Sequence, residues 1–125
     1  MNKQERIISV AKNTIETESK AIANLAHLVN DEFAGAVEYI YNSKGRVIVT
    51  GIGKSANIAT KIVATLNSTG TPAIFMHAAD AIHGDLGTIQ QNDTVICISK
   101  SGNTPEIKVL VPLIKAIDNK LIAIT

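Results

Sequence analysis

Eight residues, Ser99-Lys100-Ser101-Gly102-Asn103-Thr104-Pro105-Glu106, gather hydroxyl side chains and a glycine between two predicted elements. The apolar run 95–98 before them predicts a buried strand, and the apolar spacing from 107 to 114 after them predicts a helix. A loop in this position offers backbone N–H groups, hydroxyl donors and the positive end of a helix dipole to an anion. The sequence therefore predicts a phosphate site.

The end of this loop also predicts how the helix begins. Thr104 is a suitable N-cap, and Pro105 suits the first helical position because its missing N–H would have no partner there. Glu106 then lies in the first turn, beside the expected anion. A carboxylate next to phosphate is electrostatically unfavourable, which indicates a chemical role. The alternative is that Glu106 only complements the helix dipole.

Composition limits the class of protein. The chain has 125 residues, 46% hydrophobic and 18% charged, which is typical of one globular domain with its own core. The net charge of +1 and the scattered Lys and Arg residues disfavour nucleic acid and membrane surfaces as partners. The apolar runs have the length of strands, and the amino terminus does not read as a signal peptide, so we expect a cytoplasmic protein. Cys97, the one cysteine, is expected to be a core thiol.

The order of elements predicts an α/β fold. Two helices come first, over 2–29 and from 31 to about 44. On the first helix, Ile8, Ile15 and Ile22 are seven residues apart and form an apolar stripe, which predicts that part of this helix packs either on another subunit or within the chain. Strands and helices then alternate, which predicts a three-layer α/β/α parallel sheet of the flavodoxin-like, nucleotide-fold-like kind. We expect strands at 46–50, 72–76, 94–98 and 121–125, helices at 56–69 and 104–117, and an irregular segment from 77 to 87.

A second loop, Gly51-Ile52-Gly53-Lys54-Ser55-Ala56, follows the first predicted strand. It is not a phosphate-binding P-loop, because that motif needs a glycine where Ile48 stands. It matches the dinucleotide pattern formally, but the second strand ends in Met76-His77, without the acid that would hold a ribose. What remains is a glycine turn that presents Lys54 and Ser55 over the same crevice as the loop of residues 99–104. The alternative for Lys54 is a solvated lysine at a helix start.

The segment between the second and third strands holds two histidines and two aspartates, His77, Asp80, His83 and Asp85. A metal site is disfavoured, because the histidines lack the i, i+4 spacing and no cysteine is near. His83 could move protons for a bound sugar, because histidine titrates near neutral pH. His77 is interpreted as structural.

Four motifs, in this order, resemble one family: 51–55, 68–72, 83–87 and 98–107. They resemble the sugar isomerase (SIS) domain and, within it, the D-arabinose 5-phosphate isomerases of the pathway to 3-deoxy-D-manno-octulosonate (Kdo) and lipopolysaccharide. The resemblance implies interconversion of D-arabinose 5-phosphate and D-ribulose 5-phosphate through a cis-enediol, with no metal or organic cofactor. It also implies a homo-oligomer, a dimer or a tetramer, with a phosphorylated sugar as ligand.

The resemblance implies a role for each motif residue. Lys54 would stabilise the enediolate, Glu106 would transfer the proton, and His83 would open the sugar ring or shuttle protons. The phosphate would be held by hydroxyl and glycine positions, with Ser55 assisting: Ser99, Ser101, Gly102 and Thr104.

The resemblance covers the whole chain, 1–125, as one SIS domain that we expect to continue beyond Thr125. The family's further strand and helices, with a glutamate and a histidine thought to reach the active site from a neighbouring subunit, have no counterpart here, and neither do its tandem cystathionine β-synthase-like domains. Two alternatives stay open: an SIS isomerase of another sugar phosphate, and a non-catalytic phosphosugar sensor.

Overall fold

The capping pair expected at the start of the chain is present in the computed structural model, which describes residues 1–125. The Glu5 N–H donates to Asn2 Oδ1, and the Asn2 N–H donates to Glu5 Oε2, each at 2.8 Å. These bonds start α1 (Lys3–Leu25), which ends four residues before the predicted boundary. α2 (Asp31–Asn42) follows, capped by Asn30. The chain divides into two units, Met1–Val37 and Glu38–Thr125.

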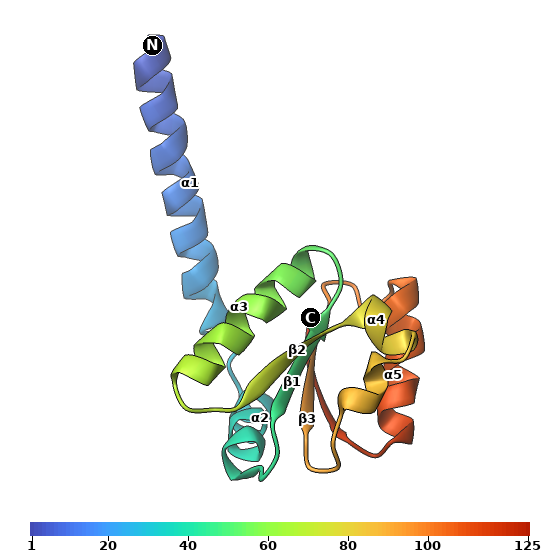
Figure 1. Cartoon of the computed structure of the whole chain (residues 1–125). Helices are drawn as coiled ribbons and strands as arrows, with labels where there is room; N and C mark the ends of the chain where they lie inside the picture. Colours follow the sequence, from blue (N-terminus) through green and yellow to red (C-terminus); the bar gives the residue numbers. More distant parts are fainter. The chain divides into compact units, whose positions relative to one another are not determined.

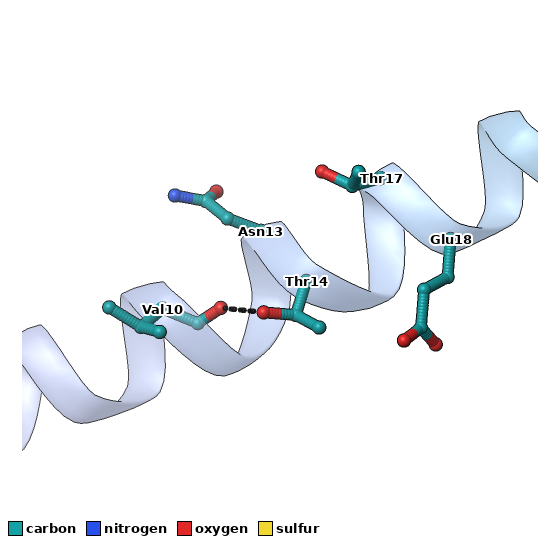
Figure 2. A pocket seen from close by; sticks show the side chains of 5 residues that line it. All are labelled: Val10, Asn13, Thr14, Thr17 and Glu18. Carbon is teal, nitrogen blue, oxygen red and sulfur yellow. Dashed lines mark hydrogen bonds between the residues drawn. The ribbon is translucent and has the colours of Figure 1, made fainter. Parts of the chain in front are cut away.

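No residue of α1 is buried. Ile8, Ile15 and Ile22, seven apart, are each more than half exposed. The expectation that part of this helix packs on a second subunit stays a prediction. A hollow on its surface is lined by side chains of this one helix, where Thr14 Oγ1 donates to the Val10 carbonyl at 3.0 Å (Figure 2). The helix is not long and apolar enough to cross a membrane, and neither is any other in the chain.

The second unit is built on a four-stranded parallel sheet in the order β2-β1-β3-β4, as expected (Figure 1). β-branched runs form its centre, and every residue of the two central strands is buried. The strands are β1 (Val47–Gly51), β2 (Ala73–His77), β3 (Thr94–Ile98) and β4 (Lys120–Ile124).

Helices cover both faces of this sheet, so the three-layer prediction is confirmed (Figure 1). α3 (Lys54–Ser68) packs on one face through Ala59. α4 (Ala78–Ile82) and α5 (Pro105–Ala116) pack on the other. Cys97 lies in the core of that second face, where burial raises the pKa of its thiol.

The expectation of an irregular segment over 77–87 is wrong in part. It contains α4 and a 3-10 turn, η1 (Asp85–Thr88). The helix forms because the His77 imidazole accepts a hydrogen bond from the Ala79 N–H, and because Ala78 and Ala81 are buried against the core. Tertiary burial and one side-chain cap outweigh the Gly and Asp residues that favoured an irregular chain.

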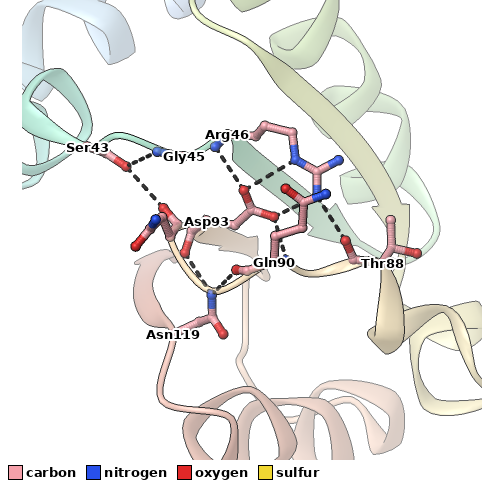
Figure 3. A network of polar contacts seen from close by, with 8 residues as sticks. Ser43, Gly45, Arg46, Thr88, Gln90, Asp93 and Asn119 are labelled. Carbon is pink, nitrogen blue, oxygen red and sulfur yellow. Dashed lines mark hydrogen bonds and ion pairs between the residues drawn. The ribbon is translucent and has the colours of Figure 1, made fainter.

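The amino edge of the sheet is held by an ion pair between residues 47 positions apart (Figure 3). The Arg46 guanidinium donates to both Asp93 carboxylate oxygens, at 3.2 and 2.7 Å, and the Arg46 N–H donates to Oδ1 at 2.8 Å. The Gln90 N–H adds a bond to Oδ2 at 2.7 Å, and Asn119 Nδ2 donates to the Gln90 and Asp93 carbonyls at 2.9 Å. The Asp93 side chain is 1% exposed and fully bonded.

These bonds decide the ionisation of Asp93. Burial alone would raise the pKa of its carboxyl, but hydrogen bonds from the Arg46 guanidinium and from the Gln90 and Arg46 N–H groups outweigh it, so the pKa lies below its usual value. A carboxyl whose pKa is lowered by folding stabilises the protein above its unfolded pKa of about 3.9. That stabilisation is lost as pH falls from there through the folded value.

Replacing Asp93 by Asn should therefore lower the free energy of unfolding by about 2 to 3 kcal/mol at pH 7, because the buried network loses its negative charge and one of its two acceptor oxygens. The difference from wild type should shrink as pH falls below about 4, because wild type then loses the same contribution. Urea denaturation between pH 2 and pH 7 measures both effects.

The control is Glu16→Gln, which removes the exposed 3.2 Å pair between Glu16 and Lys20. It should change stability by less than about 0.5 kcal/mol. A pH-independent difference between Asp93→Asn and wild type would contradict an ionised Asp93 in the network.

Candidate functional site

The carboxyl edge of the sheet has its topological switch point between β1 and β3 (Figure 1). α3 follows β1 onto one face, and α5 follows β3 onto the other. In open parallel sheets such a divergence leaves a crevice outside the strand ends, where ligands bind. The loop of residues 52–53 and the loop of residues 99–104 both leave the sheet at this point, so the two motifs predicted from sequence are brought to one edge.

Gly51 sets how closely these loops approach. A Cβ on this residue would lie 3.1 Å from the Ser55 carbonyl carbon and 3.2 Å from the Ile98 carbonyl oxygen. Both distances are tighter than most Cβ contacts, so a side chain here would push the end of β1, the start of α3 and the end of β3 apart by a few tenths of an ångström. The close approach of the two loops therefore favours glycine at this position.

The loop of residues 99–104 is shaped by its own hydroxyls. The Gly102 N–H donates to Ser99 Oγ at 2.9 Å, and the Asn103 N–H donates to Ser101 Oγ at 3.1 Å. Gly102 has φ +69°, in the left-handed region where glycine carries no steric cost. Each serine oxygen accepts from the backbone, so each keeps its own proton to donate. The two hydroxyls can thus order the loop and bind an anion together.

Thr104 occupies the N-cap of α5 as predicted, with Pro105 at the first helical position. Its hydroxyl makes no capping bond, and its Oγ1 is buried without any hydrogen-bond partner. An unpaired buried hydroxyl is costly unless a ligand satisfies it. It lies at the positive end of the α5 dipole, where free N–H groups favour an anion.

The Gly53 turn opens α3 at the other side of the edge. Gly53 has φ +60° and leaves the helix N-terminus without a side-chain cap. Lys54 and Ser55 follow as the first helical residues, Lys54 exposed and Ser55 half-buried. An ammonium group and a second uncapped helix N-terminus therefore stand at the same edge as the hydroxyl loop.

Glu106 and His83 lie on two neighbouring helices, α5 and α4. Glu106 is half-buried in the first turn of α5, directly after the hydroxyl loop. His83 lies at the carboxyl end of α4, exposed and followed by Gly84 with φ +132°. The structure thus brings Lys54, Ser55, the hydroxyl loop and Glu106 to one edge, and it places His83 one short helix away from that edge.

Sequence reasoning missed two polar contacts that hold the segment between β2 and β3. One is the Arg46–Asp93 pair, whose members are too far apart in the chain for any local pattern to link them. The other is His77, whose Nδ1 accepts from the Ala79 N–H at 3.1 Å. A signal for it was present, because His77 directly precedes an alanine pair with helical spacing at 78 and 81.

Away from this edge, few side chains are arranged to bind a metal or a ligand. No cluster of three or more His, Cys, Asp or Glu side chains has the geometry to hold a metal. A hollow beside the polar network at the amino edge is lined by Leu86, Gly87, Ile89, Gln90, Gln91, Ile117 and Asn119, none of which is an expected site residue.

Residues 39–125 match the model of the SIS domain family, and the chain therefore belongs to that family. Over all 125 residues it is 45% identical to arabinose 5-phosphate isomerase KdsD of Pseudomonas aeruginosa. Over 120 residues it is 46% identical to arabinose 5-phosphate isomerase KpsF of Escherichia coli O6:H1. It spans 38% and 37% of the lengths of these two curated relatives, and 100% and 95% of the chain is covered.

A solved structure agrees with this assignment. The E. coli CFT073 protein c3406, in complex with arabinose 5-phosphate, superposes with a TM-score of 0.90 at 40% identity. The match covers 98% of this chain and 65% of that protein. The fold predicted from sequence is thus the fold of a solved relative.

Replacing Thr104 by Val should weaken the binding of inorganic phosphate about tenfold or more, because a hydroxyl donor to a charged group is lost. Stability without ligand should not fall, because valine has the same shape and removes a hydroxyl that has no partner. Phosphate titration by NMR and thermal unfolding measure the two quantities.

Thr94→Val is the matched control. Thr94 Oγ1 is also buried without a partner, but it lies at the amino end of β3. That variant should bind phosphate as wild type does. Equal loss of affinity in both variants would contradict a specific role for Thr104.

Proposed function

We propose that this chain binds a phosphorylated sugar at the carboxyl edge of its sheet and interconverts D-arabinose 5-phosphate with D-ribulose 5-phosphate. The observation that carries the proposal is that one edge combines a hydroxyl loop, with an unsatisfied buried Thr104 hydroxyl, and the pair Lys54 and Glu106. Relatives that share 40 to 46% of the residues support this choice of sugar: two are named arabinose 5-phosphate isomerases, and the third is a solved structure in complex with arabinose 5-phosphate.

The phosphate end of the sugar would lie on the loop of residues 99–104. Ser99 and Ser101 would donate their hydroxyl protons, and Thr104 would donate the proton that has no acceptor in the protein. Gly102 would admit the phosphate close to the backbone, because it carries no side chain. Ser55 would assist from the start of α3. Anchoring the phosphate fixes the position of the reacting carbons at the other end of the sugar.

The reaction moves one proton between neighbouring carbons. Glu106 would take the proton from C2 of the open-chain aldose, and the electron pair would form the enediolate with negative charge on O1. Lys54 would stabilise that oxygen as charge develops. Return of the proton to C1, with transfer of the O2 proton to O1, gives the ketose without oxidation or reduction. His83 would open the sugar ring or carry the proton between the oxygens.

Replacing Glu106 by Gln should lower kcat by a factor of about 100 to 10,000, because the amide cannot accept the proton. Affinity for D-arabinose 5-phosphate should stay within about threefold of wild type, because the phosphate loop is unchanged. Turnover is measured by the appearance of ketose, and affinity by calorimetry.

Asp118→Asn makes the same change of charge just past the other end of α5. Asp118 has φ +61°, a backbone conformation that asparagine also adopts. This variant should retain wild-type turnover. Wild-type turnover by Glu106→Gln would overturn the role of Glu106, whereas wild-type chain that binds the sugar without any turnover would favour the sensor alternative.

A further inference from the structure

The segment between β2 and β3 carries His83 but has few hydrogen bonds within its own two short helices. α4 has five residues and η1 has four, and Gly84 joins them at φ +132°. Helices this short do not form in water without tertiary support, because nucleation costs more than the few hydrogen bonds return. His83, Gly84 and Asp85 are all exposed. Core contacts of Ala78 and Ala81 seat α4, and the hydrogen bonds at the two ends of the segment are the other groups that can set the position of His83.

His77 holds the first end. Its Nδ1 accepts the Ala79 N–H at 3.1 Å, which satisfies one of the free N–H groups at the start of α4. An accepting Nδ1 places the proton of the neutral ring on Nε2. The Phe75 ring meets the imidazole edge-on, with centroids 6.2 Å apart and planes at 90°. This edge-to-face contact favours the ring orientation in which Nδ1 accepts from Ala79.

Arg46 and Asp93 hold the second end (Figure 3). Arg46 Nη2 donates to the Thr88 carbonyl, the last residue of η1, at 2.9 Å. The Gln90 N–H donates to Asp93 Oδ2 at 2.7 Å. The same guanidinium that pairs with the buried carboxylate therefore also binds the end of the segment that carries His83.

We propose that His77 and Arg46 are positioning residues, which fix the two ends of the His83 segment and thereby hold the His83 imidazole at a defined place beside the carboxyl edge. The catalytic consequence rests on the proposed function, whereas the order of the segment does not. His77 acts through its Nδ1 as a helix cap and does not touch the sugar. An acceptor of another kind at position 77 should therefore replace it.

The test compares His77→Ala with His77→Asn. Asparagine is a preferred N-cap and restores the acceptor without the imidazole. In the free protein, amide hydrogen exchange over residues 79–83 should be about fivefold faster in His77→Ala, and within about twofold of wild type in His77→Asn. With D-arabinose 5-phosphate, kcat should fall about tenfold in the alanine variant with KM little changed, because the phosphate loop lies after another strand. Asparagine should restore kcat.

Arg46→Lys tests the second end and keeps the positive charge. Lysine lacks the planar fork that bridges Asp93 and the Thr88 carbonyl, so exchange should rise over residues 83–90 and stay at the wild-type rate over 79–82. This separation also distinguishes a local effect from global unfolding, which would speed exchange everywhere.

Two results would overturn the proposal. Unchanged exchange over 79–83 in His77→Ala would show that the cap does not order the segment. Failure of His77→Asn to restore kcat, with exchange restored, would show that the imidazole itself is needed. Absence of turnover in the wild-type chain would refute the proposed function alone, because the exchange measurements require no sugar.

Discussion

The parallel pairing of β1 with β3 is the constraint on which the rest of the second unit depends. It places Gly51 beside Ile98 at one edge, so that the loops after both strands start side by side. α3 and α5 must then leave on opposite faces, because both faces of a central parallel sheet need cover. Two helix N-termini without side-chain caps therefore stand at the same edge of the sheet. A side chain at position 51 would shift these elements by a few tenths of an ångström.

Polar side chains at the two edges of the sheet differ in whether they have hydrogen-bond partners. The amino edge is closed by the buried Asp93 carboxylate, whose acceptor sites are all used by Arg46 and Gln90. The carboxyl edge keeps a buried hydroxyl at Thr104 without a partner and exposes Lys54. Satisfied polar groups stabilise a fold, whereas unsatisfied ones at a crevice favour a ligand. The Arg46–Asp93 pair at the amino edge and the Thr104 hydroxyl at the carboxyl edge thus have opposite physical roles.

Most of this architecture could be predicted from the sequence because its signals are local. Apolar runs of β-branched residues gave the strands to within one residue, and Asn2 with Glu5 marked a capping box that is present. Loop motifs after two strands could be assigned to one edge because parallel strands share their polarity. The family follows from the same motifs, and residues 39–125 confirm it.

What could not be predicted depends on contacts between distant residues. Nothing local links Arg46 to Asp93, and the burial of Asp93 exists only once the sheet has formed. α4 was missed because five residues are too few to show a helical period, and its stability comes from a cap and from core contacts. The unpaired, buried state of the Thr104 hydroxyl could not be predicted from the sequence either, because only the fold buries it. The roles of Lys54, Glu106 and His83 stay predictions.

Proton NMR of the chain with D-arabinose 5-phosphate in heavy water tests the central claim most directly. An isomerase that works through an enediol exchanges the transferred proton with solvent, so D-ribulose 5-phosphate should appear with deuterium at C1, and recovered aldose with deuterium at C2. Binding of the sugar, seen as broadened signals, without exchange or product would contradict the isomerase and leave a phosphosugar-binding domain.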